Sequence, residues 1–262
     1  MPEPTELNWI AEADVATDML SSFVVPLYVQ DENGRPTVFG SAFYVRAGAT
    51  HFVVSAAHVL ETMRTRPVFH FVSPNERERL VGEPMLSPWD GDRKDDPIDV
   101  GVLKLTGTSP PYHDISKLAV DLADPAYFSP GLLPRVDRVY AIIGFPASRS
   151  TVWNQAKQVK AASYAYRGIS LPEEEYAAHN CSPSTHVILE LDLEDCVDSH
   201  GIQRTFPKPQ GMSGSPVWML AEKVNSGSRV YPIVGIGIEY RKAQRALVAT
   251  DIGVAIDMIT ST

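Results

Sequence analysis

Residues 23–55 read FVVPLYVQDENGRPTVFGSAFYVRAGATHFVVS, and this stretch decides the fold class. It contains three short runs of β-branched and aromatic residues, from Phe23 to Val29, from Val38 to Val45 and from His51 to Ser55. Asn33-Gly34 separates the first two runs and Ala47-Gly48 separates the next two, and both pairs are typical of turns between strands. We therefore expect three consecutive strands joined by tight turns.

The same pattern continues on both sides of a chain breaker at Ser129-Pro130-Gly131. The further strands that we expect are Val68 to Val72, Val100 to Leu105, Arg138 to Gly144, Ala156 to Tyr166, His186 to Leu191, Val217 to Leu220, Val230 to Ile238 and Leu247 to Thr250. Apolar spacing predicts a helix from Pro4 to Leu20 and a short closing helix from Ile252 to Ile259. The pattern predicts an all-β protein with an N-terminal helical extension (1–20) and two halves of about six strands each (21–128 and 129–262). Two β-barrels or a pair of sandwiches would satisfy it.

Composition excludes several classes of function. The chain has 262 residues, of which 44% are apolar, and this length allows one or two domains with a buried core. Its 23 basic and 32 acidic residues give a net charge of −9, which repels phosphate backbones, so we expect no nucleic-acid partner. No apolar run approaches the roughly 18 residues that a membrane span needs, so we expect no membrane partner. The acidic start, MPEPTE, does not resemble a secretory signal, and we expect a cytoplasmic location.

Few residues suggest a metal or a disulfide. Cys181 and Cys196 are the only cysteines, and we expect two free thiols, with a single bridge between them as the alternative. The stretch from Gly82 to Pro97 is rich in acidic residues, but it lacks the ligand ladder of a calcium loop. We expect a solvated acidic loop there, and neither a metal nor a cofactor.

Three short patterns carry residues with chemical potential. In Ser55-Ala56-Ala57-His58, small residues leave space beside an imidazole, although a histidine that only begins a helical turn fits equally well. Asp99 stands at the head of the apolar run Val100 to Leu105, where a desolvated carboxylate needs specific hydrogen-bond donors. The alternative there is an exposed aspartate that closes the acidic loop, a role that fits Asp95 or Asp96 better.

The third pattern is Gly211-Met212-Ser213-Gly214-Ser215-Pro216. Glycines on both sides of a serine allow a tight turn whose backbone N–H groups can point at one spot, as an oxyanion hole requires, although an ordinary loop has the same composition. The order His58, Asp99, Ser213 divides the three residues between the two halves, so a cleft between the halves could assemble them. The α/β-hydrolases have a different elbow, Gly-x-Ser-x-Gly, and a different order of residues, and are excluded.

Together these motifs resemble those of chymotrypsin/trypsin-like serine peptidases, and most closely the disulfide-poor bacterial trypsin-like members with an HtrA-type protease domain. The match runs from about residue 21 to residue 259. The supporting matches are Gly40-Ser41-Ala42-Phe43, Gly144-Phe145-Pro146 and Gly235-Ile236-Gly237-Ile238. Ser215 and Met212 depart from the family pattern, which has a glycine and an acidic or amide residue at these positions. The resemblance implies two six-stranded antiparallel β-barrels of the chymotrypsin type.

The resemblance also implies a serine endopeptidase with a catalytic triad. Ser213 would be the nucleophile, His58 the general base and Asp99 the residue that orients the imidazole, while the N–H groups of Gly211 and Ser213 would bind the oxyanion. The substrate-binding residues would be Pro207 at the base of the primary pocket and Ile238, Glu239 and Tyr240 along its wall. Because proline offers no charge to a cationic side chain, we expect a small or medium apolar residue before the scissile bond of the protein or peptide substrate. The alternative is that Glu239 supplies a carboxylate at the rim of the pocket.

The sequence also leads to expectations about how activity is controlled and about one alternative function. A protease that acts among the cell's own proteins needs restraint, and we expect either a regulatory protein partner or a disordered active site to supply it. The N-terminal helix is one candidate docking element for such a partner. In the secreted relatives that the motifs resemble, cleavage creates a new amino terminus, which pairs with an aspartate just before the nucleophile. Met212 stands at this position and has no charge for such a pair, so we expect activity to need no N-terminal processing. We expect the Met212 side chain to pack against apolar surface under the serine turn instead. The alternative function is a catalytically silent trypsin-fold module that binds a partner protein through the same cleft.

Overall fold

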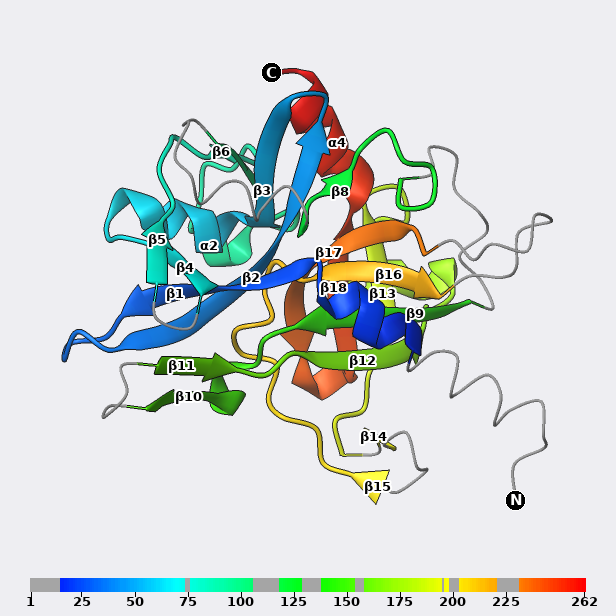
Figure 1. Ribbon diagram of the computed structural model, residues 1–262. Helices are drawn as coiled ribbons and strands as arrows, with labels where there is room; N and C mark the ends of the chain where they lie inside the picture. The colour runs from blue at the N-terminus through cyan, green and yellow to red at the C-terminus, as the bar shows by residue number, and fades with distance from the viewer. Residues whose placement is uncertain are drawn as a thin grey trace.

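The computed structural model describes residues 15–73, 76–105, 118–128, 138–153, 158–194, 196–197, 203–220 and 231–262. Two large β-sheets, one from each half of the sequence, pack against each other (Figure 1). The strands of the first half are β1 (Val24–Gln30), β2 (Pro36–Ala47), β3 (Thr50–Ala56), β4 (Phe69–Ser73), β5 (Glu76–Arg79), β6 (Met85–Leu86), β7 (Val100–Lys104) and β8 (Val120–Asp121). Their order is β5-β4-β1-β2-β3-β7-β6, and β8 pairs with β2 in parallel while the other pairings are antiparallel.

The second half forms a six-stranded antiparallel sheet. Its strands are β9 (Val139–Gly144), β12 (Tyr164–Ile169), β13 (His186–Glu190), β16 (Pro216–Leu220), β17 (Ile233–Arg241) and β18 (Ala246–Asp251), in the order β12-β9-β16-β17-β18-β13. A bridge between Ser170 and Leu189 joins the two edge strands of this sheet. Two small hairpins stand apart from it, β10 (Ser150–Trp153) with β11 (Gln158–Ala161), and β14 (Cys196–Val197) with β15 (Gln203–Arg204).

Helices are few and short. They are α2 (Ala57–Glu61), α4 (Ile252–Thr260), a helical segment at residues 15–21, and single 3₁₀ segments at Thr62–Arg64, Arg93–Asp95, Ala147–Arg149, Glu173–His179 and Lys242–Gln244. The side chain of Asp251 caps α4 by accepting a hydrogen bond from the Gly253 N–H over 2.7 Å. Leu20 from the first helical segment and Ile259 from α4 are both buried in the shared core.

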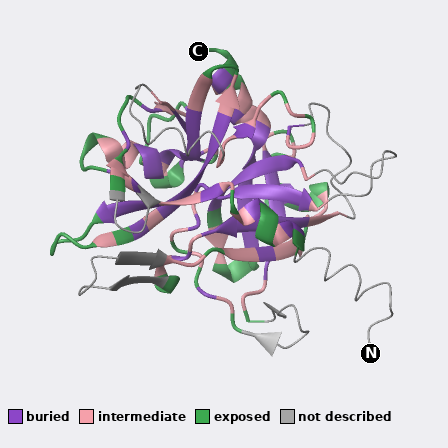
Figure 2. Cartoon of the chain, viewed as in Figure 1, coloured by how far each residue is buried: buried purple, intermediate pink, exposed green. Residues whose placement is uncertain are grey.

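The alternation of side chains along each strand builds three large apolar clusters among the described residues, beside a small fourth one around Tyr176. On β2, Tyr44 faces a cluster inside the first half, and Phe43 faces a cluster shared by both halves. On β9, Ile142 faces a cluster inside the second half, and Ile143 faces the shared one. Because successive side chains of a strand point to opposite faces, each of these strands contributes to two cores, and buried residues run along both sheets (Figure 2). The shared cluster fixes the two halves against each other.

The prediction of an all-β fold of the chymotrypsin two-barrel type is confirmed, with differences in detail. The first sheet has eight strands instead of six, and β5, β6 and β8 are not among the strands expected from the sequence. β6 and β8 are only two residues long and carry no strong sequence signal. The single strand expected from Ala156 to Tyr166 is two strands, β11 and β12, which belong to different sheets. Most of the expected helix from Pro4 to Leu20 lies outside the described residues, and its described end is helical from residue 15.

The acidic loop was predicted correctly only in part, since Asp90, Asp92 and Asp95 are exposed but Asp96 is buried. The stretch from Gly82 to Pro97 contains β6 and a 3₁₀ segment, and it buries Ser87 and Asp96, which are 1% and 6% exposed. Asp96 is therefore no exposed, loop-closing carboxylate. Burial tends to raise the pKa of Asp96, but hydrogen bonds from Ser87, the Ile98 N–H and Arg93 outweigh it and hold this pKa below its usual value.

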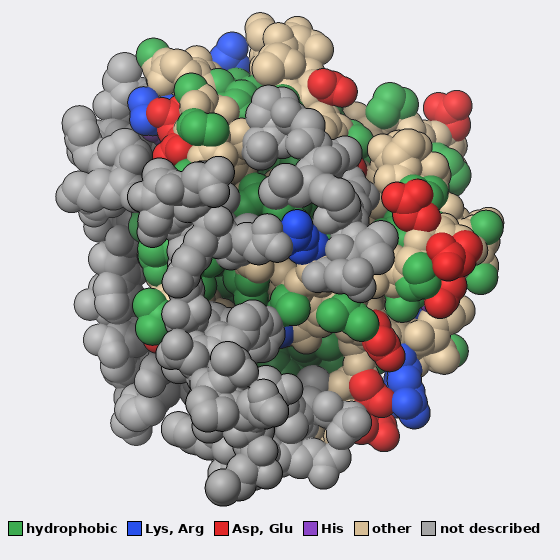
Figure 3. Space-filling model, turned by 90° about the vertical axis from the view of Figure 1, so that its right-hand side faces the viewer, with side chains coloured by type: hydrophobic (Ala, Val, Ile, Leu, Met, Phe, Trp, Pro, Cys, Tyr) green, Lys and Arg blue, Asp and Glu red, His purple; other side chains and the backbone are tan. Residues whose placement is uncertain are grey.

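Cys181 is a free thiol. Among the described residues, no helix combines the length and the apolar character that crossing a bilayer requires. On the face shown in Figure 3, the described side chains form no continuous basic patch, and acidic and basic groups lie interspersed.

Candidate active site

His58 lies where the first sheet gives way to a helix. β3 ends at Ala56, and α2 begins at Ala57, so His58 is the second residue of the helix. Ala56 and Ala57 are fully buried, and their small size lets the chain turn close against β7. The His58 side chain is 34% exposed, so its ring faces solvent on one side and protein on the other.

Asp99 meets the same histidine from the start of β7. The pairing of Ala56 with Val100 in the β3–β7 ladder brings the residue before β7 next to the residues after β3. The Asp99 carboxylate accepts one hydrogen bond from the His58 backbone N–H (2.8 Å) and lies 2.5 Å from Nδ1 of the same residue. A carboxylate here accepts a hydrogen bond from the Nδ1–H group, which leaves Nε2 of His58 as the atom able to take a proton from another group.

The environment of Asp99 is strongly desolvated. The residue is 5% exposed, and burial raises the pKa of its carboxyl above the usual value, although the hydrogen bonds and charge of His58 act in the opposite direction. Asp99 also has a φ of 42°, in the left-handed region that non-glycine residues rarely occupy. The expectation of a buried carboxylate with a specific partner is met by this structure.

Ser213 lies in a tight turn that precedes β16. Gly211 and Gly214 adopt φ values of 91° and 89°, which favour glycine. The turn is closed by hydrogen bonds from the Met212 N–H to the Pro209 carbonyl (2.9 Å) and from the Ser215 N–H to the Met212 carbonyl (3.0 Å). A Cβ on Gly214 would lie 2.1 Å from Ser55 Oγ and 2.2 Å from the Ser41 carbonyl oxygen, so only glycine fits this close approach of the two halves.

Two N–H groups of this turn are uncommitted. The turn uses the N–H groups of Met212, Gly214 and Ser215, whereas within the described part of the chain neither Gly211 nor Ser213 donates a hydrogen bond. The Gln210 carbonyl accepts a hydrogen bond from the Ala147 N–H over 2.7 Å. Since a trans peptide directs its C=O and the next N–H to opposite sides, the Gly211 N–H points away from Ala147. The two free donors are the groups that an oxyanion hole needs.

All three motif residues line one cleft of about 1400 Å³ between the two halves. The first half contributes His58 and Asp99, and the second half contributes Ser213 and, beneath it, Met212. Among the described residues, Ser213 Oγ and His58 Nε2 form no hydrogen bond in this structure. Met212 is 2% exposed and packs in the core of the second half with Tyr140 and Ile142, so the expectation of apolar packing under the turn is confirmed.

Three of the four expected substrate-binding residues line the cleft, and one does not. Ile238, Glu239 and Tyr240 line the cleft. Pro207 is buried and does not line it, and its carbonyl accepts a hydrogen bond from the Tyr166 hydroxyl over 2.6 Å. The Glu239 carboxylate forms an ion pair with Arg241 (2.7 Å) and remains 53% exposed.

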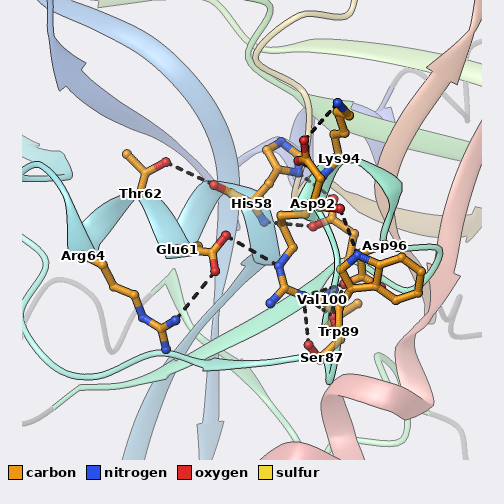
Figure 4. Close-up of polar contacts among 12 residues, drawn as sticks. His58, Glu61, Thr62, Arg64, Ser87, Trp89, Asp92, Lys94, Asp96 and Val100 are labelled. Atoms are coloured by element: carbon orange, nitrogen blue, oxygen red, sulfur yellow. Dashed lines mark hydrogen bonds and ion pairs between the residues drawn. The ribbon is translucent and has the colours of Figure 1, made fainter.

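The acidic loop forms one wall of the cleft beside His58 (Figure 4). Arg93 binds the Asp96 carboxylate over 2.7 Å, and the Ser87 hydroxyl donates to the same carboxylate over 2.6 Å. Lys94 pairs with Asp92 over 2.9 Å. The loop thus carries its own counter-ions, and among the described residues no group of three or more potential metal ligands converges.

Sequence reasoning missed one residue that organises the site. Ser41 was noted only as part of the Gly40-Ser41-Ala42-Phe43 match, yet it is fully buried and touches the serine turn twice. Its N–H donates to the Ser213 carbonyl (2.8 Å), and its hydroxyl donates to the Gly211 carbonyl (2.9 Å). A serine within a strand of apolar residues is the signal that could have identified it, because a buried hydroxyl needs a partner.

The backbone resembles those of two solved proteases. A Glu endopeptidase, solved in complex with MPD, aligns with a TM-score of 0.51 at 12% identity, covering 92% of this chain and 90% of that chain. Neuropsin, a serine protease expressed in the limbic system of mouse brain, aligns with a TM-score of 0.53 at 14% identity, covering 92% of this chain and 94% of its own. No protein-family model and no curated protein sequence matches this chain. At these identities the likeness shows a chymotrypsin-like fold.

Proposed function

We propose that this protein is a serine endopeptidase that hydrolyses peptide bonds of protein substrates through Ser213, His58 and Asp99. The observation that carries the proposal is the Asp99 carboxylate 2.5 Å from His58 Nδ1, in the same cleft as a serine turn with two uncommitted N–H groups. The fold and the likeness to serine proteases support it. The resemblance of the sequence motifs to those of HtrA-type protease domains supports an HtrA-type subfamily as part of this proposal.

The chemistry follows from the atoms available. Nε2 of His58 takes the hydroxyl proton as Ser213 Oγ attacks the peptide carbonyl, and it returns that proton to the leaving amine to give an acyl-enzyme. Asp99 holds the proton on Nδ1 and stabilises the imidazolium that forms. The N–H groups of Gly211 and Ser213 stabilise the oxyanion, and the loss of one such donor costs roughly 3 kcal/mol in related enzymes. Water then releases the acyl group by the reverse sequence.

The decisive experiment is labelling with a fluorophosphonate probe. We expect wild-type protein to react at Ser213 and Ser213→Ala to remain unlabelled. Ser215→Ala is the matched control, because Ser215 lies in the same turn but is fully buried and its hydroxyl has no hydrogen-bond partner among the described residues. If wild type and Ser213→Ala react equally poorly, the peptidase proposal is wrong, and the alternative of a catalytically silent protein-binding module is favoured.

We propose an apolar residue before the scissile bond. The part of the cleft that the second half lines contains Leu193, Phe206, Met212, Ile238 and Leu247. The nearby Glu239 carboxylate is engaged by Arg241, which reduces its availability to a cationic substrate. Cleavage of a peptide library mainly after arginine or lysine would contradict this preference. Cleavage mainly after acidic residues would also contradict it and would direct attention to Lys208, which lines the same cleft.

Activity without N-terminal processing belongs to the same proposal. Met212 is enclosed by apolar neighbours, and a free amino group placed beside it would be an unpaired buried cation, which costs several kcal/mol. Mass spectrometry of the fluorophosphonate-labelled species should find the full chain. Labelling confined to a species trimmed to a start near Ser22 would contradict this part.

Regulation by a protein partner and a cytoplasmic location complete the proposal. The helical segment at residues 15–21 exposes Val15 (71%) and Met19 (44%), while Leu20 is fully buried in the shared core. Deleting residues 1–20 would open that core, so the suitable variant is Val15→Ser with Met19→Ser. Regulation that is unchanged in this double variant would argue against docking on the helix. The free thiol of Cys181 is compatible with a reducing compartment.

A further inference from the structure

Two consecutive carbonyls just before Asp99 are held by side chains from the other half of the molecule. Nε2 of His186 lies 2.8 Å from the Pro97 carbonyl oxygen, and the Thr250 hydroxyl donates to the Ile98 carbonyl over 2.5 Å. His186 begins β13 and Thr250 lies in β18, both in the second half. The segment that ends in Asp99 is therefore bound across the interface between the halves.

The two donors act as a pair. His186 and Thr250 are directly opposite each other in the antiparallel β13–β18 ladder, which places their side chains on the same face of the sheet. Both are buried, at 3% and 0% exposure. A carbonyl can only accept, so Nε2 of His186 carries a proton. Nδ1 of the same ring lies 2.9 Å from the Thr185 hydroxyl and 3.3 Å from both the nitrogen and the carbonyl oxygen of Ser182.

The segment that they bind needs support. Asp99 has a φ of 42°, and a residue with a side chain persists in this region only when its surroundings hold it there. From the first half, the Asp96 carboxylate accepts from the Ile98 N–H (2.9 Å), and the Ala57 N–H donates to the Asp99 carbonyl (2.8 Å). The pair from the second half completes the support on the remaining carbonyls.

We propose that His186 and Thr250 are positioning residues, which hold Pro97 to Asp99 so that the Asp99 carboxylate faces Nδ1 of His58. Only the expected effect on the reaction rate rests on the proposed function. The contact between the Asp99 carboxylate and the His58 imidazole is present in the resting protein. A shift of the carboxylate by about 1 Å would lower the rate of serine acylation roughly 10- to 100-fold.

The test uses full-length variants that remove or keep each donor. Thr250→Val removes the hydroxyl at nearly constant shape, and Thr250→Ser keeps it. His186→Leu removes the ring donor, and His186→Gln keeps an N–H near the Nε2 position. Val187→Ala is the control for loss of stability alone, because Val187 follows His186 in β13 but its side chain is buried in the core of the second half, on the opposite face of the strand.

The first readout is the far-downfield proton resonance of the His58 Nδ1–H that is shared with Asp99, and it needs no enzymatic activity. The second is the rate and pH profile of fluorophosphonate labelling. We expect Thr250→Val and His186→Leu to lose or shift the resonance and to label roughly 10- to 100-fold more slowly. Thr250→Ser, His186→Gln and the folded fraction of Val187→Ala should keep both properties.

Several outcomes would overturn the proposal. It is wrong if Thr250→Val and His186→Leu retain the wild-type resonance and labelling rate, or if the wild-type protein lacks the resonance. If Thr250→Val does not fold, the two His186 variants decide. If wild type shows the resonance but does not label, the proposed peptidase function fails, while the response of the resonance to these variants still decides the positioning role.

Discussion

Ser41 and Gly211 are joined across the interface between the two halves, where the Ser41 hydroxyl donates to the Gly211 carbonyl over 2.9 Å. The Ser41 hydroxyl oxygen also accepts a hydrogen bond from the Phe145 N–H over 3.0 Å. A residue of β2 thus fixes the peptide group that follows one of the two free N–H donors of the serine turn. The orientation of that turn depends on a residue of the opposite half.

Replacing this hydroxyl should loosen the turn. Ser41→Ala leaves the Gly211 carbonyl and the Phe145 N–H without their partner, and a buried group left in this way costs about 1–3 kcal/mol in the free energy of unfolding. We also expect fluorophosphonate labelling to slow at least several-fold, because the oxyanion donors lose their fixed orientation. Urea unfolding and labelling rates measure the two effects. Ser55→Ala is the control, since the Ser55 hydroxyl donates to the Ser41 carbonyl. Equal labelling rates for the two variants would contradict the prediction.

Gly214 should be the least replaceable glycine of the site. Gly214→Ala places a Cβ 2.2 Å from the Ser41 carbonyl oxygen at a φ of 89°. Gly34→Ala is the matched control, because Gly34 has a φ of 73° and nothing within 4 Å of the added Cβ. The control should lose about 1–2 kcal/mol from the left-handed conformation alone. Gly214→Ala should lose clearly more stability, together with labelling at Ser213. Similar losses of stability in both variants, measured by urea unfolding, would show that the close approach is not rigid.

Asp99→Asn should separate activity from stability. We expect labelling to fall about 10⁴-fold, because an amide favours the wrong imidazole tautomer. Because the pKa of Asp99 is raised by burial, the folded protein binds more protons than the unfolded chain between the usual pKa of 3.8 and the raised value, and stability falls as pH rises through that window. The variant lacks this penalty, so its stability relative to wild type should increase with pH there and then level off. Parallel stability curves from urea unfolding at a series of pH values would contradict this.

His70 should contribute a pH dependence of the opposite sign. Its ring is buried between the Tyr44 hydroxyl, 2.8 Å from Nδ1, and the Glu78 carboxylate, 3.4 Å from Nε2. Burial lowers its pKa from 6.5 to about 4, so between these values the unfolded chain binds a proton that the folded protein does not. Stability should therefore be lost as pH falls through this window, by up to about 1.4 kcal/mol per pH unit. His70→Gln should flatten this slope in thermal or urea unfolding, and an unchanged slope would assign it to other groups.

Much of the fold and of the candidate site could be predicted from local sequence patterns. The turns at Asn33-Gly34 and Ala47-Gly48 were readable because turn chemistry is local, and Gly34 and Gly48 have the positive φ values that such turns use. His58, Asp99 and Ser213 each stood inside a short motif, and the structure brings all three to one cleft. The short strands β6 and β8 escaped prediction because two residues give no periodicity.

Contacts between distant segments were the part that the sequence could not reveal. Asp96 looked like one more solvated acid, but Ser87 and Arg93 make it a buried acceptor. His186 looked like the first residue of an ordinary strand, and its contact with Pro97 spans 89 positions of the chain. No local propensity encodes such pairings, since they depend on how the two halves dock.

The division of the cleft between two halves has a consequence for protein synthesis. When the ribosome has added Lys104, the last residue of β7, the whole β3–β7 ladder beside His58 can form, but Ser213 and the donors that hold Pro97 and Ile98 are still to be made. Thr250 enters the chain only with β18, well after Ser213. Since domains fold as units while the chain emerges, a nascent chain that has completed its first half carries an imidazole and a carboxylate but no assembled centre. The cleft can therefore be aligned only after β18 has been synthesised.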